Sequence, residues 1–440
     1  MIDDSCADLF CETFYPIPVA FILWPPIFNE FMSVKDIILI NVFGADQPGI
    51  TSQVTQVLAN FDASVLDIGQ AVIHDQLNLG ILAAVPDAGV SEAVTAAVSE
   101  RIKRLDMRVK FLPISIQQYR DWVDQQGKKR HIVTLLARKI EARHLAAVTE
   151  ITADLGLNID KIVRLSGRVP LGADETLGRA CIEFSARGEP RDAELLRTSL
   201  LELAGLYNID IAYQQDTIYR RSRQLVVFDM DSTLIDAEVI DELAHEAGVG
   251  QQVAAITEAA MQGELDFEQS FRQRLALLEG LPVDVLQSVA KRLRLNEGAE
   301  YLIKRLKQLG FKTAIVSGGF IYFARYLQSI LGVDYVYANE LDTHDGHVTG
   351  RVSGTIIDGQ MKAQLLRELA HREGLRLEQV IAVGDGANDL PMLQIAGLGI
   401  AFRAKPLVVA SAQQSISNLG LDGILYLLGY SDRAIDVLDD

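Results

Sequence analysis

Residues 225–234 constrain the possible folds of this chain more than any other segment. Leu225 to Phe228 form a short apolar run with two valines, which predicts a strand buried on both faces of a parallel sheet. Asp229 and Asp231 follow directly, and ligands of open α/β sheets bind beyond the carboxyl ends of strands. Such carboxylates can attack phosphorus, transfer protons and hold Mg²⁺. Taken alone, the pair is better explained as a polar strand end with a helix cap.

Two further polar groups could hold a phosphate. Ser317, Gly318 and Gly319 follow a predicted strand at 312–316, where a hydroxyl and backbone N–H groups can bind phosphate oxygens. Lys362 lies in the first turn of a predicted helix at 359–371, and phosphoryl transfer requires a fixed cation. Taken separately, the triplet is better explained as a tight turn and Lys362 as a solvated lysine.

A second acidic strand end lies at residues 384–389. Asp385 follows a predicted strand at 379–383, and the glycines on either side allow close backbone approach. Asn388 and Asp389 could reach the same metal ion or orient Asp385. The repeated position, directly after a buried strand, predicts that these groups meet at one edge of the sheet.

The segment at about 237–297 predicts a helical cap. It separates the first strand from the rest of the sheet, and its apolar residues recur at helical spacing. A cap over the strand ends can exclude water and carry specificity groups. Glu238 and Arg274 are its candidate substrate-binding residues, although each could be a solvated helix residue.

Two repeats with the order βαββαβ precede this region. We expect them at 35–115 and 130–214, and a period this long indicates two small domains. The turn at 44–49 contains Asp46 and Gly49 and could bind a ligand through backbone N–H groups, or simply join strand to helix. Residues 138–141 lack the corresponding Pro-Gly, so the second repeat is expected to serve packing or pairing. We interpret 214–224 as a solvated linker.

Composition narrows the functional class. The net charge of −18 argues against nucleic acid or a membrane surface as the main partner. Three cysteines in 440 residues give no disulfide framework, which predicts a cytoplasmic protein. The apolar segment within residues 1–34 contains four prolines and is too short to span a bilayer. We expect residues 1–34 to be a poorly ordered extension.

In combination, the motifs of residues 222–440 resemble the haloacid dehalogenase (HAD) superfamily, and more closely its phosphoserine phosphatases. The resemblance rests on the two aspartates, the Ser-Gly-Gly triplet, the lysine and the segment Gly-Asp-Gly-Ala-Asn-Asp. It implies a Rossmann-like parallel sheet with a helical cap at 237–297. The repeats resemble ACT domains, which are ferredoxin-like modules that often bind amino acids and associate side by side, so a homodimer is expected.

The resemblance also implies a role for each site residue. Asp229 would be the nucleophile and Asp231 the acid and base. Asp229, the Asp231 backbone carbonyl and Asp385 would hold Mg²⁺. The residues that would bind substrate are Glu238, Arg274, Ser317, Gly318, Lys362 and Asn388.

The implied reaction is hydrolysis of O-phosphoserine to serine and phosphate, the last step of serine biosynthesis, with serine or another amino acid as candidate effector at Asp46 and Gly49. Alternatives are a HAD phosphatase or phosphotransferase for another small phosphorylated metabolite, or an ACT-based amino-acid sensor with reduced catalysis.

Overall fold

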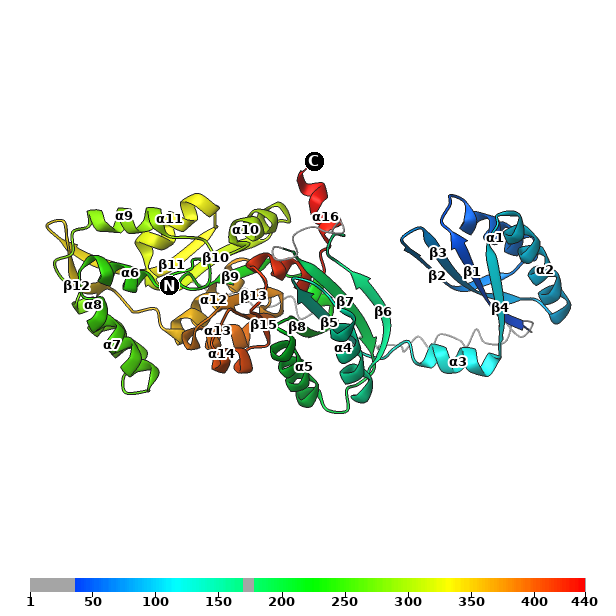
Figure 1. Cartoon of the computed structure of the whole chain (residues 1–440), viewed down its shortest axis with the longest axis horizontal. Helices are drawn as coiled ribbons and strands as arrows, with labels where there is room; N and C mark the ends of the chain where they lie inside the picture. Colours follow the sequence, from blue (N-terminus) through cyan, green and yellow to red (C-terminus); the bar gives the residue numbers. More distant parts are fainter. Residues whose placement is uncertain (1–35, 169–177, 440) are drawn as a thin grey trace, which may run out of the picture. The chain divides into compact units, whose positions relative to one another are not determined.

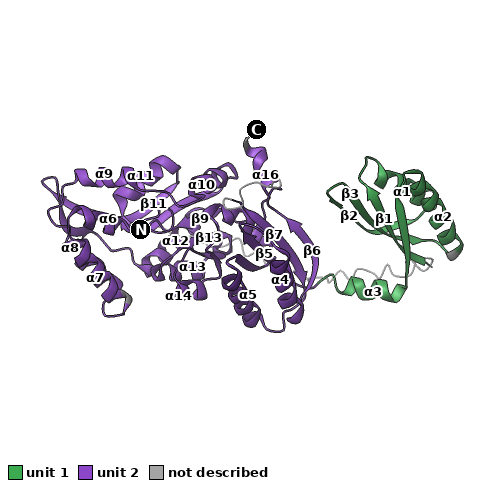
Figure 2. Cartoon of the chain, in the orientation of Figure 1, with its two compact units in different colours: residues 1–127 green, residues 128–440 purple. Residues whose placement is uncertain are grey.

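The computed structural model describes residues 36–168 and 178–439, so the predicted extension at 1–34 lies outside the described residues. The chain forms two compact units, residues 1–127 and residues 128–440 (Figures 1 and 2). The first contains the first repeat. The second contains the second repeat together with the large parallel sheet, so the two repeats belong to different structural bodies.

Unit 1 is a four-stranded antiparallel sheet with the order β2-β3-β1-β4 and two covering helices. Alternate residues of the central strand, Ile38, Ile40 and Val42, point into its core because side chains alternate between the faces of a strand. The βαββαβ order predicted from the sequence is therefore confirmed. Its elements are β1 (Asp36–Ala45), α1 (Ile50–Ala59), β2 (Ser64–Ile73), β3 (Gln76–Val85), α2 (Ala88–Arg104) and β4 (Arg108–Ile114).

A further helix, α3 (Ile116–Asp124), was not predicted. It begins at a capping box, in which Ser115 accepts a hydrogen bond from the Gln118 N–H while the Gln118 side chain accepts one from the Ser115 N–H. None of its residues is buried. Ile116, Tyr119 and Val123 recur at helical spacing, so the segment carried a helix pattern that sequence reasoning overlooked.

The second repeat has the same topology, with sheet order β6-β7-β5-β8. Val133 and Leu135 on β5 pack beneath its helices. On the opposite face, Leu136, Cys181 and Ala212 belong to the main core of residues 222–440, which we call the catalytic region because the sequence predicts the active site there. The second repeat is thus built into the catalytic body. Its elements are β5 (Arg130–Ala137), α4 (Ala142–Asp154), β6 (Asn158–Arg164), β7 (Ala180–Arg187), α5 (Ala193–Tyr207) and β8 (Asp210–Gln215).

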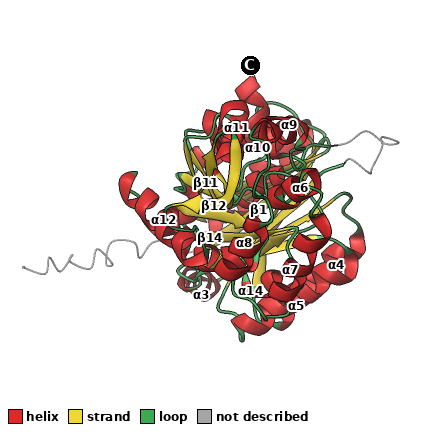
Figure 3. Ribbon diagram, turned by 90° about the vertical axis from the view of Figure 1, so that its left-hand side faces the viewer, coloured by secondary structure: helices red, strands yellow, loops and turns green. Residues whose placement is uncertain are grey.

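The catalytic region contains a seven-stranded sheet with the order β12-β11-β10-β9-β13-β14-β15. All pairings are parallel except β11 with β12. Val226 and Phe228 of β9 face one core, and Leu225 and Val227 face another. Helices consequently cover both sides of the strands (Figure 3), which confirms the predicted α/β fold. The strands are β9 (Leu225–Phe228), β10 (Lys312–Phe320), β11 (Tyr335–His344), β12 (His347–Ser353), β13 (Val380–Gly384), β14 (Leu398–Phe402) and β15 (Gln414–Ile416).

Four cap helices lie between β9 and β10 in the chain, as predicted. They are α6 (Val239–Glu246), α7 (Gly250–Met261), α8 (Phe267–Ala276) and α9 (Asp284–Arg292). The remaining helices are α10 (Ala299–Gln308), α11 (Ile321–Leu331), α12 (Gly359–Arg372), α13 (Leu390–Ile395), α14 (Pro406–Ser411), α15 (Ile424–Leu427) and α16 (Asp432–Asp436).

The interpretation of 214–224 as a solvated linker is wrong. Arg220 is 4% exposed and pairs with Glu183, and Arg223 is 8% exposed and donates to the Gln214 side chain and the Gly397 carbonyl. The segment carries the chain from β8 into β9 through the contact between the second repeat and the catalytic sheet. Arg220 and Arg223 are charged residues, but both side chains are buried and hydrogen-bonded within this contact.

Candidate active site

Three neighbouring strands bring the predicted site residues to one edge of the sheet. β9 pairs in parallel with β10 and β13, so the carboxyl ends of these strands lie side by side. Asp229 follows β9, Ser317 lies near the end of β10, and Asp385 follows β13. The Asp229 N–H donates to the Val383 carbonyl at 2.8 Å, which fixes the nucleophile candidate directly beside the third strand.

Lys362 lies at the centre of this edge. Its side chain is fully buried, and its Nζ atom lies 2.7 Å from both Asp229 Oδ1 and Asp389 Oδ1. Burial alone would lower its pKa, but the carboxylates of Asp229 and Asp389 outweigh that effect and raise the pKa. Lys362 therefore stays charged. The first turn of α12, capped by Asp358, holds its backbone.

The surrounding carboxyl groups are largely buried and lie close to one another. Burial, together with repulsion from Asp389, raises the pKa of Asp229 well above its usual value. Burial and the nearby Glu238 raise the pKa of Asp231 in the same way. For Asp385, burial and Asp389 raise the pKa to about 7. So many negative groups close together favour the binding of a cation.

Three of these carboxylates can meet on one ion. Oxygen atoms of Asp229, Asp385 and Asp389 lie within 4.8 Å of one another. An all-oxygen set of this kind suits Mg²⁺. Asp389 Oδ1 is already paired with Lys362, and its Oδ2 accepts from the Gly386 N–H at 2.9 Å, so Asp389 acts on the cluster mainly as a fixed negative charge. The donor set fits the predicted metal, which Asp229 and Asp385 would hold through their side chains.

Two glycines allow the carboxylates to lie this close to the strands. A Cβ atom on Gly319 would lie 2.5 Å from Asp231 Oδ2, and one on Gly384 would lie 2.3 Å from the carboxyl carbon of Asp389. No side chain fits at either position. The sequence predicted close backbone approach around Asp385, and the same requirement holds at the Ser-Gly-Gly triplet.

The predicted phosphate-binding residues line the same edge. Ser317 is fully buried and its Oγ atom accepts from the Gly319 N–H at 2.8 Å. A Cβ atom on Gly318 would lie 3.7 Å from Asn388 Nδ2 and 3.1 Å from the ring of Phe267. Asn388 thus faces the triplet across the site, and the cap helix α8 reaches the triplet through Phe267.

Glu238 and Arg274 come from different cap helices and face the same space. Glu238 directly precedes α6 and accepts a hydrogen bond from Ser232 Oγ at 2.8 Å. Burial raises its pKa, and Arg274 partly opposes that shift. Burial lowers the pKa of Arg274, while Asp241, Glu238 and Asp231 act in the opposite direction. The Val239 N–H also donates to Asp231 Oδ1 at 3.2 Å, so the structure brings the start of α6, with Glu238, next to Asp231. Arg274 is close enough for its charge to act on Glu238.

Sequence reasoning missed Asn296, which holds the turn after Asp231. Asn296 is 6% exposed, and its Nδ2 atom donates to the carbonyls of Ser232, Thr233 and Ile235 at 3.1, 2.9 and 3.1 Å. Ser232 has a φ of +55°, which is uncommon for a residue other than glycine. We call residues 232–235 the catalytic turn, because its side chains also bind Glu238 and approach Asp385.

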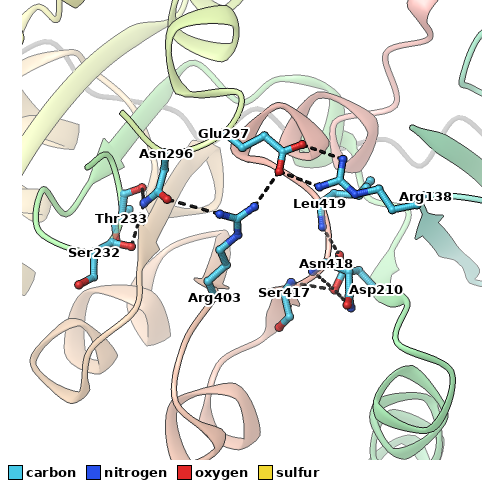
Figure 4. A network of polar contacts seen from close by, with 10 residues as sticks. All are labelled: Arg138, Asp210, Ser232, Thr233, Asn296, Glu297, Arg403, Ser417, Asn418 and Leu419. Carbon is cyan, nitrogen blue, oxygen red and sulfur yellow. Dashed lines mark hydrogen bonds and ion pairs between the residues drawn. The ribbon is translucent and has the colours of Figure 1, made fainter. Parts of the chain in front are cut away.

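A chain of polar contacts runs from this turn to the second repeat (Figure 4). Arg403, at the end of β14, lies 3.5 Å from Asn296 Oδ1 and 2.7 Å from Glu297 Oε2. Arg138, at the end of β5, donates to both Glu297 oxygens at 2.7 Å. No local pattern in the sequence indicates this network, because its members are scattered from residue 138 to residue 403.

The turn at 44–49 of unit 1 is the candidate ligand site of the first repeat. Asp46 is exposed, and its N–H donates to the Asp75 carbonyl at 2.7 Å. Gly49 precedes α1 with a φ of +90° and caps the helix without any side-chain hydrogen bond. Asp46 is thus not the helix cap, and the first N–H groups of α1 have no side-chain partner at this position.

The catalytic region and both repeats match models of known protein families. Residues 226–394 match the model of haloacid dehalogenase-like hydrolases, and residues 36–112 and 129–214 each match an ACT domain model. Within the described residues, no helix is long and apolar enough to cross a membrane.

Two curated relatives match almost their whole length. A phosphoserine phosphatase of Streptomyces coelicolor is 40% identical over 91% of this chain and 94% of its own. A phosphoserine phosphatase of Mycobacterium tuberculosis is 40% identical over 93% of this chain and 97% of its own. Among solved structures, a probable phosphoserine phosphatase from Vibrio cholerae covers 70% of this chain and 88% of its own at 34% identity, with a TM-score of 0.54.

Proposed function

Because the chain belongs to the phosphoserine phosphatase family of haloacid dehalogenase-like hydrolases, we propose that the edge formed by β9, β10 and β13 carries out its reaction. It hydrolyses O-phosphoserine to serine and phosphate through an aspartyl-phosphate. The observation that carries this proposal is the position of Lys362, fully buried and 2.7 Å from Asp229, where it can bind the phosphoryl group that the aspartate attacks.

Asp229 attacks phosphorus while the bond to the serine oxygen breaks. Asp231 gives its proton to that oxygen, so serine leaves as a neutral alcohol. Asp231 then takes a proton from the water that attacks the aspartyl-phosphate, which releases phosphate and restores Asp229. One carboxyl group thus serves as acid and then base, as two-step hydrolysis requires. The Val239 N–H donates to Asp231 Oδ1 at 3.2 Å, which holds this carboxyl group against the start of the cap helix α6.

Lys362, Ser317, the Gly318 N–H and Asn388 bind the phosphate oxygens. They approach from α12, from the end of β10 and from the segment after β13. Donors fixed in this way stabilise charge where it develops during phosphoryl transfer, without reorganisation. Asp229 and Asp385, with the Asp231 backbone carbonyl, would hold Mg²⁺, which reduces the repulsion between a phosphate dianion and a carboxylate nucleophile.

Glu238 and Arg274 bind the amino-acid end of the substrate. Glu238 pairs with the ammonium group, and Arg274 pairs with the carboxylate through its planar guanidinium group. Both residues lie on the cap, so binding of the amino acid and exclusion of water from the site occur together.

The test is phosphate release from O-phospho-L-serine by the purified chain, with Mg²⁺ and with EDTA. We expect rapid release with Mg²⁺ and none with EDTA. A panel of other phosphoesters, with an alcohol added as phosphate acceptor, separates this activity from those of a general phosphatase and a phosphotransferase. Activity on the panel without activity on phosphoserine would leave the mechanism in place and remove the substrate.

The first repeat is proposed to bind an amino-acid effector at Asp46 and Gly49. The N–H groups at the start of α1 suit a carboxylate, and Asp46 suits an ammonium group. Inhibition by free L-serine that disappears in the Asp46→Ala variant would support this role. Serine inhibition that is unchanged in that variant would contradict it.

A homodimer is proposed through β2 of unit 1. Val65, Ile68, Val72 and Ile73 of this edge strand are between 40% and 71% exposed. An apolar edge strand is a surface suited to pairing with a second copy. Light scattering should give twice the chain mass for the wild type and the mass of a monomer for Ile68→Asp.

A cytoplasmic location stays a prediction.

A further inference from the structure

The turn after the first strand has different surroundings in the two repeats. In the first repeat it contains the exposed Asp46 and Gly49. In the second, the corresponding position after β5 contains Arg138, whose guanidinium forms a two-point contact with Glu297 of the catalytic region. Planar pairing of this kind fixes orientation as well as distance. The second repeat thus uses its turn to hold a catalytic-region residue.

Glu297 is placed to transmit that contact to the catalytic turn. Its Oε2 atom also accepts from Arg403 at 2.7 Å, and its chain neighbour Asn296 binds three carbonyls of the turn. Two side chains of the catalytic turn reach site residues. Ser232 donates a hydrogen bond to Glu238, and Thr233 Oγ1 lies 3.4 Å from Asp385 Oδ1. Figure 4 shows Arg138 and Arg403 meeting at Glu297 from opposite sides.

We propose that Arg138 of the second repeat is a positioning residue for catalysis, which acts through Glu297, Arg403 and Asn296 on the turn at 232–235. This inference rests on the proposed function. Loss of Arg138 leaves Arg403 and Glu297 free to change their arrangement, so Asn296 holds the turn less firmly. The expected consequence is a misplaced Asp231 and Glu238, which lowers the rate of the chemical step.

Arg179→Ala is the matched control. Arg179 also comes from the second repeat and pairs with a catalytic-region carboxylate, that of Asp422. Like Arg138, it is about one-third exposed, at 32% against 30%. Among the described residues, neither Arg179 nor Asp422 forms a hydrogen bond with the catalytic turn or with Asn296. The segment of Asp422 meets Glu297 through a backbone hydrogen bond, from the Leu421 N–H to the Glu297 carbonyl at 2.8 Å, which Arg179→Ala leaves in place. Both variants lose an ion pair between the second repeat and the catalytic region. A loss of kcat in Arg138→Ala alone would therefore reflect the position of the catalytic turn, and an equal loss in both would reflect weaker attachment of the repeat.

The experiment compares kcat, KM and thermal midpoint for Arg138→Ala, Arg138→Lys and Arg179→Ala in the full chain. We expect kcat to fall about threefold to tenfold in Arg138→Ala, to recover in part in Arg138→Lys, and to stay at the wild-type value in Arg179→Ala. The thermal midpoint should fall in both alanine variants. Wild-type kcat in Arg138→Ala, or an equal loss of kcat in both alanine variants, would overturn the proposal.

A double-mutant cycle tests the route. If Arg138 acts through Arg403, the Arg138→Ala, Arg403→Ala double variant should be no slower than Arg403→Ala alone. Losses that multiply would show independent action and contradict the relay. The same series is measured with O-phospho-L-serine and with 4-nitrophenyl phosphate. Absence of wild-type activity on phosphoserine alone would refute the proposed substrate, while the 4-nitrophenyl phosphate series would still test the role of Arg138.

Discussion

Asp229 and Lys362 form a buried ion pair, with 2.7 Å between the Asp229 Oδ1 and Lys362 Nζ atoms. The carboxylate comes from the end of the central strand, and the ammonium group comes from the first turn of α12. In the proposed mechanism, this pair orients the nucleophile before substrate arrives. The same ammonium group would then bind the phosphoryl group, so one cation would serve the free and the reacting states.

Asp229→Asn should abolish phosphate release from phosphoserine. The amide cannot attack phosphorus, and we expect a loss of about 1,000-fold or more, the scale at which single nucleophile replacements act. The measurement is steady-state phosphate release with Mg²⁺. Asp345→Asn is the control, since it removes a carboxylate that is 89% exposed in the β11–β12 hairpin. Appreciable Mg²⁺-dependent turnover by Asp229→Asn would assign the nucleophile elsewhere.

Lys362→Met should reduce stability as well as activity. The variant leaves Asp229 and Asp389 buried without a cation, which costs about 3–5 kcal/mol of unfolding free energy. Urea denaturation measures this loss. The Lys362→Met, Asp389→Asn double variant should recover part of it, because one of the two carboxylates is then absent.

The control for that series is Lys291→Met, which removes an exposed lysine from α9. It should leave the urea midpoint within experimental error of the wild type. A Lys362→Met protein as stable as this control would mean that the buried carboxylates do not depend on Lys362.

Arg274→Ala should discriminate between substrates. If Arg274 pairs with the substrate carboxylate, kcat/KM for phosphoserine falls by the equivalent of about 2–5 kcal/mol, while kcat/KM for 4-nitrophenyl phosphate changes little. Arg272→Ala on the same helix is the control, because Arg272 is 57% exposed and pairs with Glu268. Equal losses for the two substrates would exclude a carboxylate-binding role.

The Arg138–Glu297 pair should stabilise the fold in a pH-dependent manner. Hydrogen bonds from Arg138 lower the pKa of Glu297 from the usual 4.5. A lowered folded-state pKa contributes stability that is fully present above pH 4.5 and is lost as the pH falls through the folded-state value. The difference in unfolding free energy between wild type and Arg138→Ala should therefore be constant near neutral pH and shrink below pH 4.5. Urea titrations across this range measure it, and a difference that grows on acidification would contradict the assignment.

The sequence predicted that Asp229, Ser317 and Asp385 would meet at one edge of the sheet, because their positions follow from local pattern. A buried strand ends where its apolar run ends, and the parallel pairing of β9 with β10 and β13 then brings Asp229, Ser317 and Asp385 together. Lys362 was predicted for the site, but its second partner, Asp389, was expected to act on the metal or on Asp385. Only the folded chain shows that Asp389 and Asp229 share the lysine.

The contacts that join the second repeat to the catalytic sheet were not predicted. Arg220, Arg223 and Arg138 carry no periodic signal, and a run of polar residues between two domains usually indicates a linker. Their partners, Glu183, the Gly397 carbonyl and Glu297, are distant in the sequence. Burial of such arginines depends on partners from elsewhere in the chain, which a reading along one segment does not reveal.

The packing of the second repeat against the main core determines where the chain can be shortened. Its contribution to that core comes from Leu136, Cys181 and Ala212. The sequence suggests that both copies of the repeat could be cut away together, just before β9. Such a cut would expose the apolar surface that these three residues cover, and the shortened protein should aggregate. A cut near Gly127, where the two compact units meet in the chain, follows the physical boundary. The two repeats share one topology, but the second is part of the same compact unit as the seven-stranded sheet.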